Sequence, residues 1–161
     1  MGGDRTQGAA PAVGSFVVVS SVWLNGAMLE PSTAMLSVFD HGTTVGDGVF
    51  ETMLAYPDTG ISFCADHLRR LRASAAGLFL EVPYDDDTLV RAINEVVASE
   101  TSGDANVRVR LTVTGGAGPL GSDRGGATPT VIVTQGTKRY PIPAQQLHYG
   151  FLKSLLDGMV K

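Results

Sequence analysis

Residues 40–76 read DHGTTVGDGVFETMLAYPDTGISFCADHLRRLRASAA, and this stretch decides the fold of the chain. It joins a glycine-rich turn to a run of β-forming residues at 49–56 and to a shorter run at 61–64. The Pro-Asp-Thr-Gly sequence between them favours a tight turn, because Pro presets φ and Gly accepts positive φ. The final part carries apolar residues at three- and four-residue spacing, which predicts a helix. We therefore expect a β-hairpin followed by an arginine-bearing helix.

Two helices are expected in this region. Asp66 is placed to cap the first one, and its apolar stripe would consist of Leu68, Leu71, Ala75 and Leu78. The second helix should begin among the acidic residues 85–87, because carboxylates favour the positive end of a helix dipole. Its buried face would consist of Leu89, Ile93 and Val96.

Strand signals flank the helices on both sides. Asn25-Gly26 predicts a two-residue hairpin turn between strands at 16–24 and 27–29, because both turn positions need positive φ. Residues 107–114 alternate apolar and polar side chains, which is typical of a strand with one buried face. A further strand is expected at 130–134. This order of elements, without a repeated strand–helix–strand unit, indicates the α+β class.

The composition excludes several kinds of protein. The chain has 161 residues, enough for one domain and part of a second, and its net charge of −4 argues against a general nucleic-acid binder. No apolar run approaches the length of about 18 residues that a membrane span needs, and we expect no signal peptide. Its single cysteine, Cys64, suits a cytoplasmic protein and is expected to be a small buried residue in a strand.

Two groups of residues near the start of the deciding stretch could bind a ligand, and each has a purely structural alternative. The glycines of Gly46-Asp47-Gly48 let the backbone approach a ligand closely, or they form a plain loop before a strand. Arg69, Arg70 and Arg72 lie early in a helix, where a phosphate could bind. The alternative for these arginines is a solvated basic face.

Other candidates lie further along the chain. Arg108 and Arg110 share one face of a strand, and they suit a substrate carboxylate if that face lines a cleft. Lys153 has apolar neighbours, so it is either a desolvated, reactive amine or an ordinary lysine on an amphipathic helix. We expect no metal site, because no metal-ligand spacing is present among His41, His67 and His148.

Several of these motifs occur together in a specific order. They are Asn25-Gly26, Asp40-His41-Gly42, GDGVFE at 46–51, DHLRRL at 66–71 with Ser74-Ala75, and VRVRLTVTGGAGPLG at 107–121. In this order the chain resembles the class IV aminotransferase family, the fold-type IV pyridoxal phosphate enzymes, over residues 22–134. That family includes branched-chain aminotransferases, D-amino acid aminotransferases and 4-amino-4-deoxychorismate lyases.

The resemblance implies roles for four residues. Arg70 matches the arginine that binds the phosphate of the cofactor, pyridoxal 5'-phosphate, and Phe50 lies at the substrate pocket. Arg110 matches a basic residue that helps to bind the substrate carboxylate, and Lys153 resembles the lysine that bonds to the cofactor. We therefore expect a homodimeric enzyme that acts on a small amino or keto acid. It would be a 4-amino-4-deoxychorismate lyase or a branched-chain-type aminotransferase.

Some positions depart from parts of the family. The D-amino acid aminotransferases tend to have Tyr at the position of Phe50 and Arg at that of Gly115, which disfavours that activity here. Arg124, in the glycine-rich loop, is a second candidate for binding a carboxylate.

The resemblance also predicts a domain organisation, an N-terminal domain with an antiparallel sheet and two helices. We expect a disordered tail at 1–15, this domain at 16–137, and a linker with the start of a truncated second domain at 138–161. The alternative is a non-catalytic remnant. It would act as a self-associating domain, or as an anion-binding domain that uses Gly46-Asp47-Gly48 and Arg70.

Overall fold

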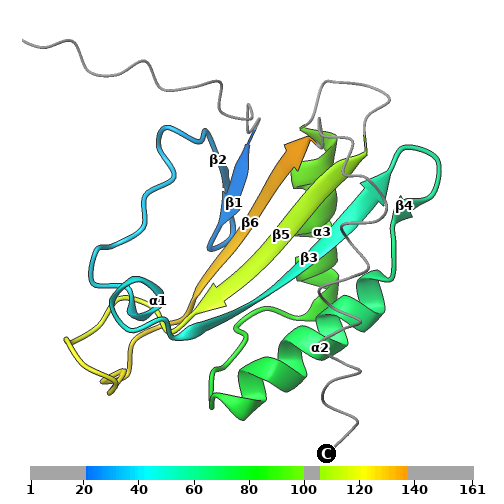
Figure 1. Ribbon diagram of the computed structural model, residues 1–161. Coiled ribbons are helices and arrows are strands. Elements are labelled where there is room, and N and C mark those ends of the chain that lie inside the picture. Colours follow the sequence, from blue (N-terminus) through cyan, green and yellow to red (C-terminus); the bar gives the residue numbers. More distant parts are fainter. Residues whose placement is uncertain (1–20, 100–105, 138–161) are drawn as a thin grey trace, which may run out of the picture.

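The computed structural model describes residues 21–99 and 106–137, which form a sheet with two helices on one of its faces (Figure 1). The six strands pair antiparallel in the order β2-β1-β6-β5-β3-β4. The strands are β1 (Val22–Leu24), β2 (Ala27–Leu29), β3 (Gly48–Tyr56), β4 (Gly60–Ile61), β5 (Val107–Thr114) and β6 (Thr130–Thr137). The helices are α1 (His41–Thr44), α2 (Cys64–Gly77) and α3 (Asp86–Ala98). The expected α+β class and antiparallel sheet are confirmed.

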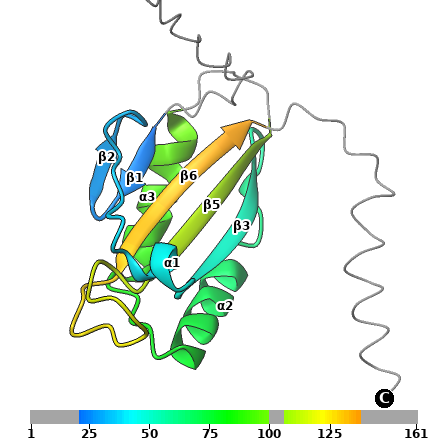
Figure 2. The same ribbon diagram turned by 60° about the vertical axis from the view of Figure 1, so that its left-hand side comes forward.

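The core lies between the sheet and the helices α2 and α3. The apolar residues of β5 are buried there, and its arginines are exposed on the opposite face, as the alternation predicts. Helix α3 buries Leu89, Ile93 and Val96, and Asp85 caps it by accepting a hydrogen bond from the Thr88 amide (2.8 Å). Figure 2 shows the other face of the sheet, the open face, where the short helix α1 lies over the ends of β5 and β6 near Thr114. Neither α2 nor α3 covers this face.

The first hairpin also follows the prediction. Asn25 (φ 47°) and Gly26 (φ 97°) form the turn between β1 and β2. The Asn25 side chain accepts a hydrogen bond from the Val131 amide (2.8 Å), which joins this turn to β6. The described part of the first strand is β1, and positions 16–20 lie outside the described residues.

Three details around α2 differ from the prediction. The return strand β4 is only two residues long, and Cys64 is partly exposed as the first residue of α2 instead of buried in a strand. The reason is Phe63, whose left-handed backbone (φ 53°) turns the chain into the helix. Asp66 does not cap α2, because the helix begins at Cys64 and Asp66 therefore lies within its first turn. Its carboxylate accepts a hydrogen bond from Arg69 (2.7 Å).

The C-terminal end of α2 differs as well. Leu68, Leu71 and Ala75 are buried as predicted, but Leu78 is 44% exposed. The helix ends at Gly77, and Phe79 then adopts a left-handed backbone (φ 53°), so Leu78 no longer follows the helical stripe.

The ends of the chain fall outside the described residues. The expected tail at 1–15 and the linker at 138–161 belong to these parts, and so do Lys153 and His148. Within residues 21–99 and 106–137, no helix has both the length and the apolar character that crossing a membrane requires.

Candidate functional site around strand β3

Strand β3 carries candidate residues on both of its faces. Its side chains alternate, so Glu51, Met53 and Ala55 are buried toward the helices, whereas Phe50 and Thr52 are exposed on the open face. One side of β3 pairs with β5 along its length, but β4 pairs only with Ala55 and Tyr56 on the other side. The Leu54 carbonyl also accepts a hydrogen bond from the Ser62 amide (2.9 Å), so the outer edge of β3 lacks a strand partner within the described part of the chain only over residues 48–53.

The open face brings Phe50 and Arg110 together. The guanidinium carbon of Arg110 lies 3.6 Å from the centroid of the Phe50 ring, a cation–π contact. The two side chains meet diagonally, because Arg110 is opposite Thr52 in the register of β3 and β5. Phe50 is 55% exposed, so the contact lies at the surface of the sheet.

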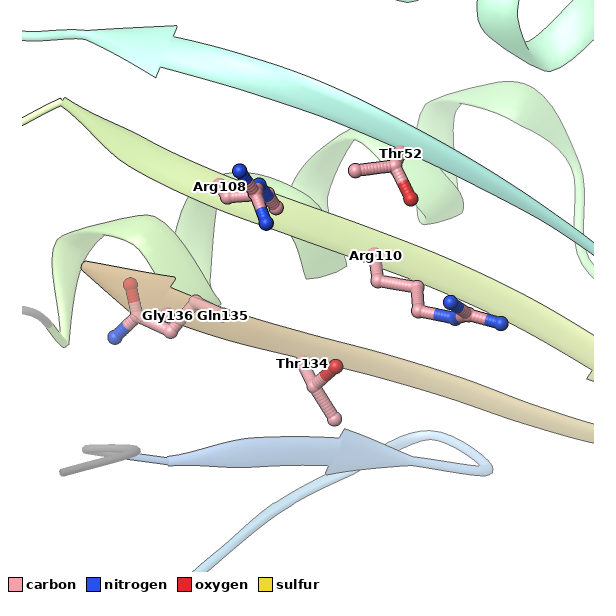
Figure 3. A pocket seen from close by; sticks show the side chains of 6 residues that line it. All are labelled: Thr52, Arg108, Arg110, Thr134, Gln135 and Gly136. Carbon is pink, nitrogen blue, oxygen red and sulfur yellow. The ribbon is translucent and has the colours of Figure 1, made fainter. Parts of the chain in front are cut away.

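A shallow hollow of about 300 Å³ lies beside this contact. It is lined by Thr52, Arg108, Arg110, Thr134, Gln135 and Gly136. Figure 3 shows Arg110 on β5 between Thr52 of β3 and Thr134 of β6. Neither Arg108 nor Arg110 forms an ion pair with a carboxylate of the described residues. The hollow therefore offers an anionic ligand two hydroxyls and two guanidinium groups whose charge no carboxylate in the described part of the chain compensates.

Arg70 lies on the other side of the sheet, where it binds Glu51. Its Nε donates to Glu51 Oε1 (3.1 Å) and its Nη2 donates to Glu51 Oε2 (2.5 Å). His67, one helical turn earlier, places Nδ1 2.7 Å from Glu51 Oε2. Because the oxygen belongs to a carboxylate, this contact indicates that Nδ1 carries the proton and donates it.

Glu51 is ionised in this arrangement. Its burial would raise the pKa of its carboxyl, but hydrogen bonds from Arg70 and His67 outweigh that effect, and the pKa lies below its ordinary value of 4.5. The charged carboxylate is thus fixed on β3 with two donors from α2.

The other two arginines of α2 have separate partners. Arg69 pairs with Asp66 on the same helix, and both side chains are exposed. Arg72 donates to Asp86 Oδ1 (2.7 Å) and to the Tyr84 carbonyl (2.8 Å), which joins α2 to the start of α3. Among the described contacts of the three arginines, only those of Arg70 include a residue of the sheet.

Arg124 is not available as a carboxylate-binding residue, contrary to the expectation from the sequence. Its Nε and Nη2 donate to the two oxygens of Asp47 (2.6 and 2.7 Å), and it also donates to the carbonyls of Phe79 (2.7 Å) and Leu78 (2.9 Å). The pKa of Asp47 is lowered, and the hydrogen bond from Arg124 is the largest cause. The turn at 46–48 therefore holds an internal ion pair. Gly115 packs against it, where an added Cβ would lie 2.5 Å from Asp47 Oδ2.

A second buried network supports the start of β3, and the sequence did not reveal it. Asp40 is fully buried and accepts hydrogen bonds from the Gly42 amide (2.8 Å) and from the hydroxyls of Thr114 and Thr130 (2.9 Å each). His41 is equally buried, and its Nδ1 donates to the Gly116 carbonyl (3.0 Å). These bonds tie the loop before β3 to the ends of β5 and β6.

The structure thus places the predicted site residues in two groups. Phe50 and Arg110 meet on the open face, and Arg70 binds Glu51 on the helix side. Because Phe50 and Glu51 are consecutive residues of β3, the two groups flank the same short segment of the strand. Lys153 lies outside the described residues. Among the described residues, no three His, Cys, Asp or Glu side chains are grouped in a way that could hold a metal ion.

Comparisons with known proteins agree on one family. The sequence profile of "Amino-transferase class IV" matches residues 48–157. A putative branched-chain-amino-acid aminotransferase of Methanocaldococcus jannaschii is 37% identical over 112 residues, which are 69% of this chain and 38% of that protein. Aminodeoxychorismate lyase of Bacillus subtilis is 33% identical over 105 residues, 65% of this chain and 34% of that protein.

A similar structure points to the same family. It is the T.th. branched-chain amino acid aminotransferase complexed with N-(5'-phosphopyridoxyl)-L-glutamate. The TM-score is 0.68 at 29% identity, and the match covers 75% of this chain and 41% of that one. The chain therefore spans about two fifths of the length of the proteins that it matches.

Proposed function

Because the chain belongs to the class IV aminotransferase family, we propose that it forms one side of an active site dependent on pyridoxal 5'-phosphate. The substrate is a small amino acid whose carboxylate binds at Arg110. The reaction is transamination of the branched-chain type, and elimination of the aminodeoxychorismate lyase type is the second candidate. The names of the relatives and the solved complex support both the family chemistry and this order.

One observation carries the substrate side of the proposal. Arg110 lies against Phe50 at a hollow on the open sheet face, and it has no carboxylate partner among the described residues. A planar guanidinium group that is held in place and uncompensated suits bidentate binding of a carboxylate. Phe50 would form an apolar wall beside the bound amino acid.

The residues present also fit a phosphorylated cofactor. Arg70 keeps N–H groups that no described residue accepts, and its side chain is 62% exposed. Such a group matches the oxygens of a phosphomonoester. When bound, pyridoxal phosphate supplies an electron sink for charge that develops at the substrate carbon. Within this chain, Arg70 would hold the phosphate and Arg110 would orient the substrate. The Lys153 amine would bond to the cofactor and would transfer the proton at the substrate carbon.

A steady-state assay with Arg110→Ala tests the proposal. L-Leucine, L-valine and L-isoleucine would be assayed with 2-oxoglutarate, and release of pyruvate from aminodeoxychorismate would report the lyase reaction. We expect Arg110→Ala to raise KM for the amino acid at least tenfold, because a charge-assisted hydrogen bond contributes about 1.5–3 kcal/mol. Arg91→Ala, on the exposed face of α3, is the matched control. Equal KM values in the two variants would contradict the role of Arg110.

Self-association is a second property that one observation favours. Met35, Val38, Phe39 and Leu120 are all more than half exposed. The two segments that carry them are joined, because the Phe39 carbonyl accepts a hydrogen bond from the Gly118 amide (3.2 Å) and Asp40 forms a β-bridge with Ala117. An exposed apolar group of this kind suits a protein interface. We propose that the chain associates as a homodimer through it, and sedimentation of a Val38→Asp variant would test this.

A further inference from the structure

We propose that Glu51 is a positioning residue, which holds the Arg70 guanidinium so that its outer edge is ready to bind a phosphomonoester. The inference rests on the proposed function and adds a residue to which the comparisons assign no role. It concerns a group that does not touch the cofactor and acts only through Arg70.

Glu51 occupies only one edge of the Arg70 guanidinium group. The hydrogen bonds from Nε to Oε1 (3.1 Å) and from Nη2 to Oε2 (2.5 Å) use the side edge of the guanidinium group, which Nε and Nη2 form together. An arginine has five N–H groups, and both N–H groups of Nη1 have no acceptor among the described residues. Nη2 also lies 3.2 Å from His67 Nδ1, but that nitrogen carries its own proton and cannot accept a hydrogen bond from it. One N–H of Nη1 and the second N–H of Nη2 form the end edge, which matches two oxygens of a phosphate. Arg70 can therefore bind Glu51 and a phosphate at the same time.

Glu51 itself is rigidly placed. It lies in the middle of β3 opposite Leu111, only 10% of its side chain is exposed, and His67 binds the same oxygen as Nη2 of Arg70. The neighbouring pair of Arg69 and Asp66 has no such anchor, since both side chains are exposed and belong to one helix. That pair supplies a matched control on α2.

A competing account makes the opposite prediction. If Glu51 were merely a counter-ion that phosphate must displace, removing its charge would strengthen phosphate binding. If Glu51 positions Arg70, then the length of the side chain at this position is important. A shorter side chain, whose carboxylate cannot accept from both Nε and Nη2 of Arg70, should weaken phosphate binding even though the charge is unchanged. Glu51→Asp keeps the charge but shortens the side chain by one methylene, whereas Glu51→Gln keeps the length and removes the charge.

The experiment measures dissociation constants for pyridoxal 5'-phosphate and for pyridoxal, which lacks the phosphate, by calorimetry on the full chain. The variants are Glu51→Asp, Glu51→Gln, Arg70→Ala and the control Asp66→Asn. We expect Glu51→Asp to weaken binding of pyridoxal phosphate about tenfold and to leave that of pyridoxal unchanged. We expect a smaller loss for Glu51→Gln and none for Asp66→Asn.

Nuclear magnetic resonance of the Arg70 side chain tests the same proposal on the wild-type chain. Addition of pyridoxal phosphate should shift the Nη signals of Arg70 while its Nε–H stays hydrogen-bonded and protected from exchange. Loss of that protection on binding would overturn the positioning role, as would tighter binding by Glu51→Gln or unchanged binding by Glu51→Asp. If Arg70→Ala bound pyridoxal phosphate as well as the wild type, the phosphate role of Arg70 would itself fail. That outcome is distinct from a failure of Glu51 alone.

Discussion

The guanidinium carbon of Arg110 lies 3.6 Å from the centroid of the Phe50 ring, on the open face of the sheet. The next residue of β3, Glu51, faces the helices and binds Arg70. Two adjacent residues of one strand therefore orient two arginines on opposite faces of the sheet. Under the proposed function, Arg110 would bind the substrate carboxylate and Arg70 would bind the cofactor phosphate.

Phe50→Leu should weaken substrate binding without unfolding the chain. A cation–π contact at an exposed site contributes about 0.5–1 kcal/mol, so KM for the amino acid should rise about two- to fivefold. The free energy of unfolding should change by less than about 0.5 kcal/mol, because Phe50 is more than half exposed. Parallel assays and urea titrations would measure both quantities. A large loss of stability would show that Phe50 has a mainly structural role.

Arg124→Lys should destabilise the chain by about 2 kcal/mol, because a lysine cannot reproduce hydrogen bonds to both oxygens of Asp47 and to two carbonyls. Urea unfolding would measure the change. Arg69→Lys is the control, since its exposed pair with Asp66 contributes little. Equal stabilities of the two variants would contradict the structural role assigned to Arg124.

The pair of Asp47 and Arg124 should also make stability depend on pH. The folded-state pKa of Asp47 is lowered from its ordinary value of 3.8, so the unfolded chain binds its proton more readily. The stabilisation is complete above the ordinary value and is lost as pH falls through the lower, folded value. Unfolding free energies measured from pH 6 downward should therefore fall less steeply in Asp47→Asn than in the wild type below about pH 4. Identical slopes would contradict this account.

Asp40→Ala should be among the most destabilising single changes, at about 3 kcal/mol or more. It would leave the Gly42 amide and the hydroxyls of Thr114 and Thr130 buried without their acceptor. Thermal and urea unfolding would measure the loss, with Glu95→Ala on the exposed face of α3 as the control. A loss below about 1 kcal/mol would show that the network is dispensable.

Local patterns in the sequence were sufficient to predict most of the fold. The alternation in β5, the Asn25-Gly26 turn and the acidic start of α3 each depend on neighbouring residues, and each prediction is confirmed. The start of α2 was less predictable, because Phe63 adopts a backbone conformation that is unusual for an aromatic residue. Asp66 has the side chain of a capping residue, but the helix begins two residues before it, at Cys64.

The partners within the site could not be predicted in this way. Glu51 and Arg70 are 19 residues apart, and Asp47 and Arg124 are 77 apart, so no spacing rule connects them. Only the register of β3 beside β5, with α2 packed on top, brings these side chains together. The roles of Arg70, Phe50, Arg110 and Lys153 came from the family resemblance, and they stay predictions.

The most direct test of the central claim is a titration of the purified chain with pyridoxal 5'-phosphate, followed by borohydride reduction and peptide mass mapping. The chain has three lysines, Lys138, Lys153 and Lys161, so the map can distinguish every side-chain amine. We predict a reduced adduct on Lys153 in the wild type, strongly diminished in Arg70→Ala. An adduct spread evenly over the three lysines and unaffected by Arg70→Ala, or no adduct at all, would contradict the claim that this chain holds the cofactor.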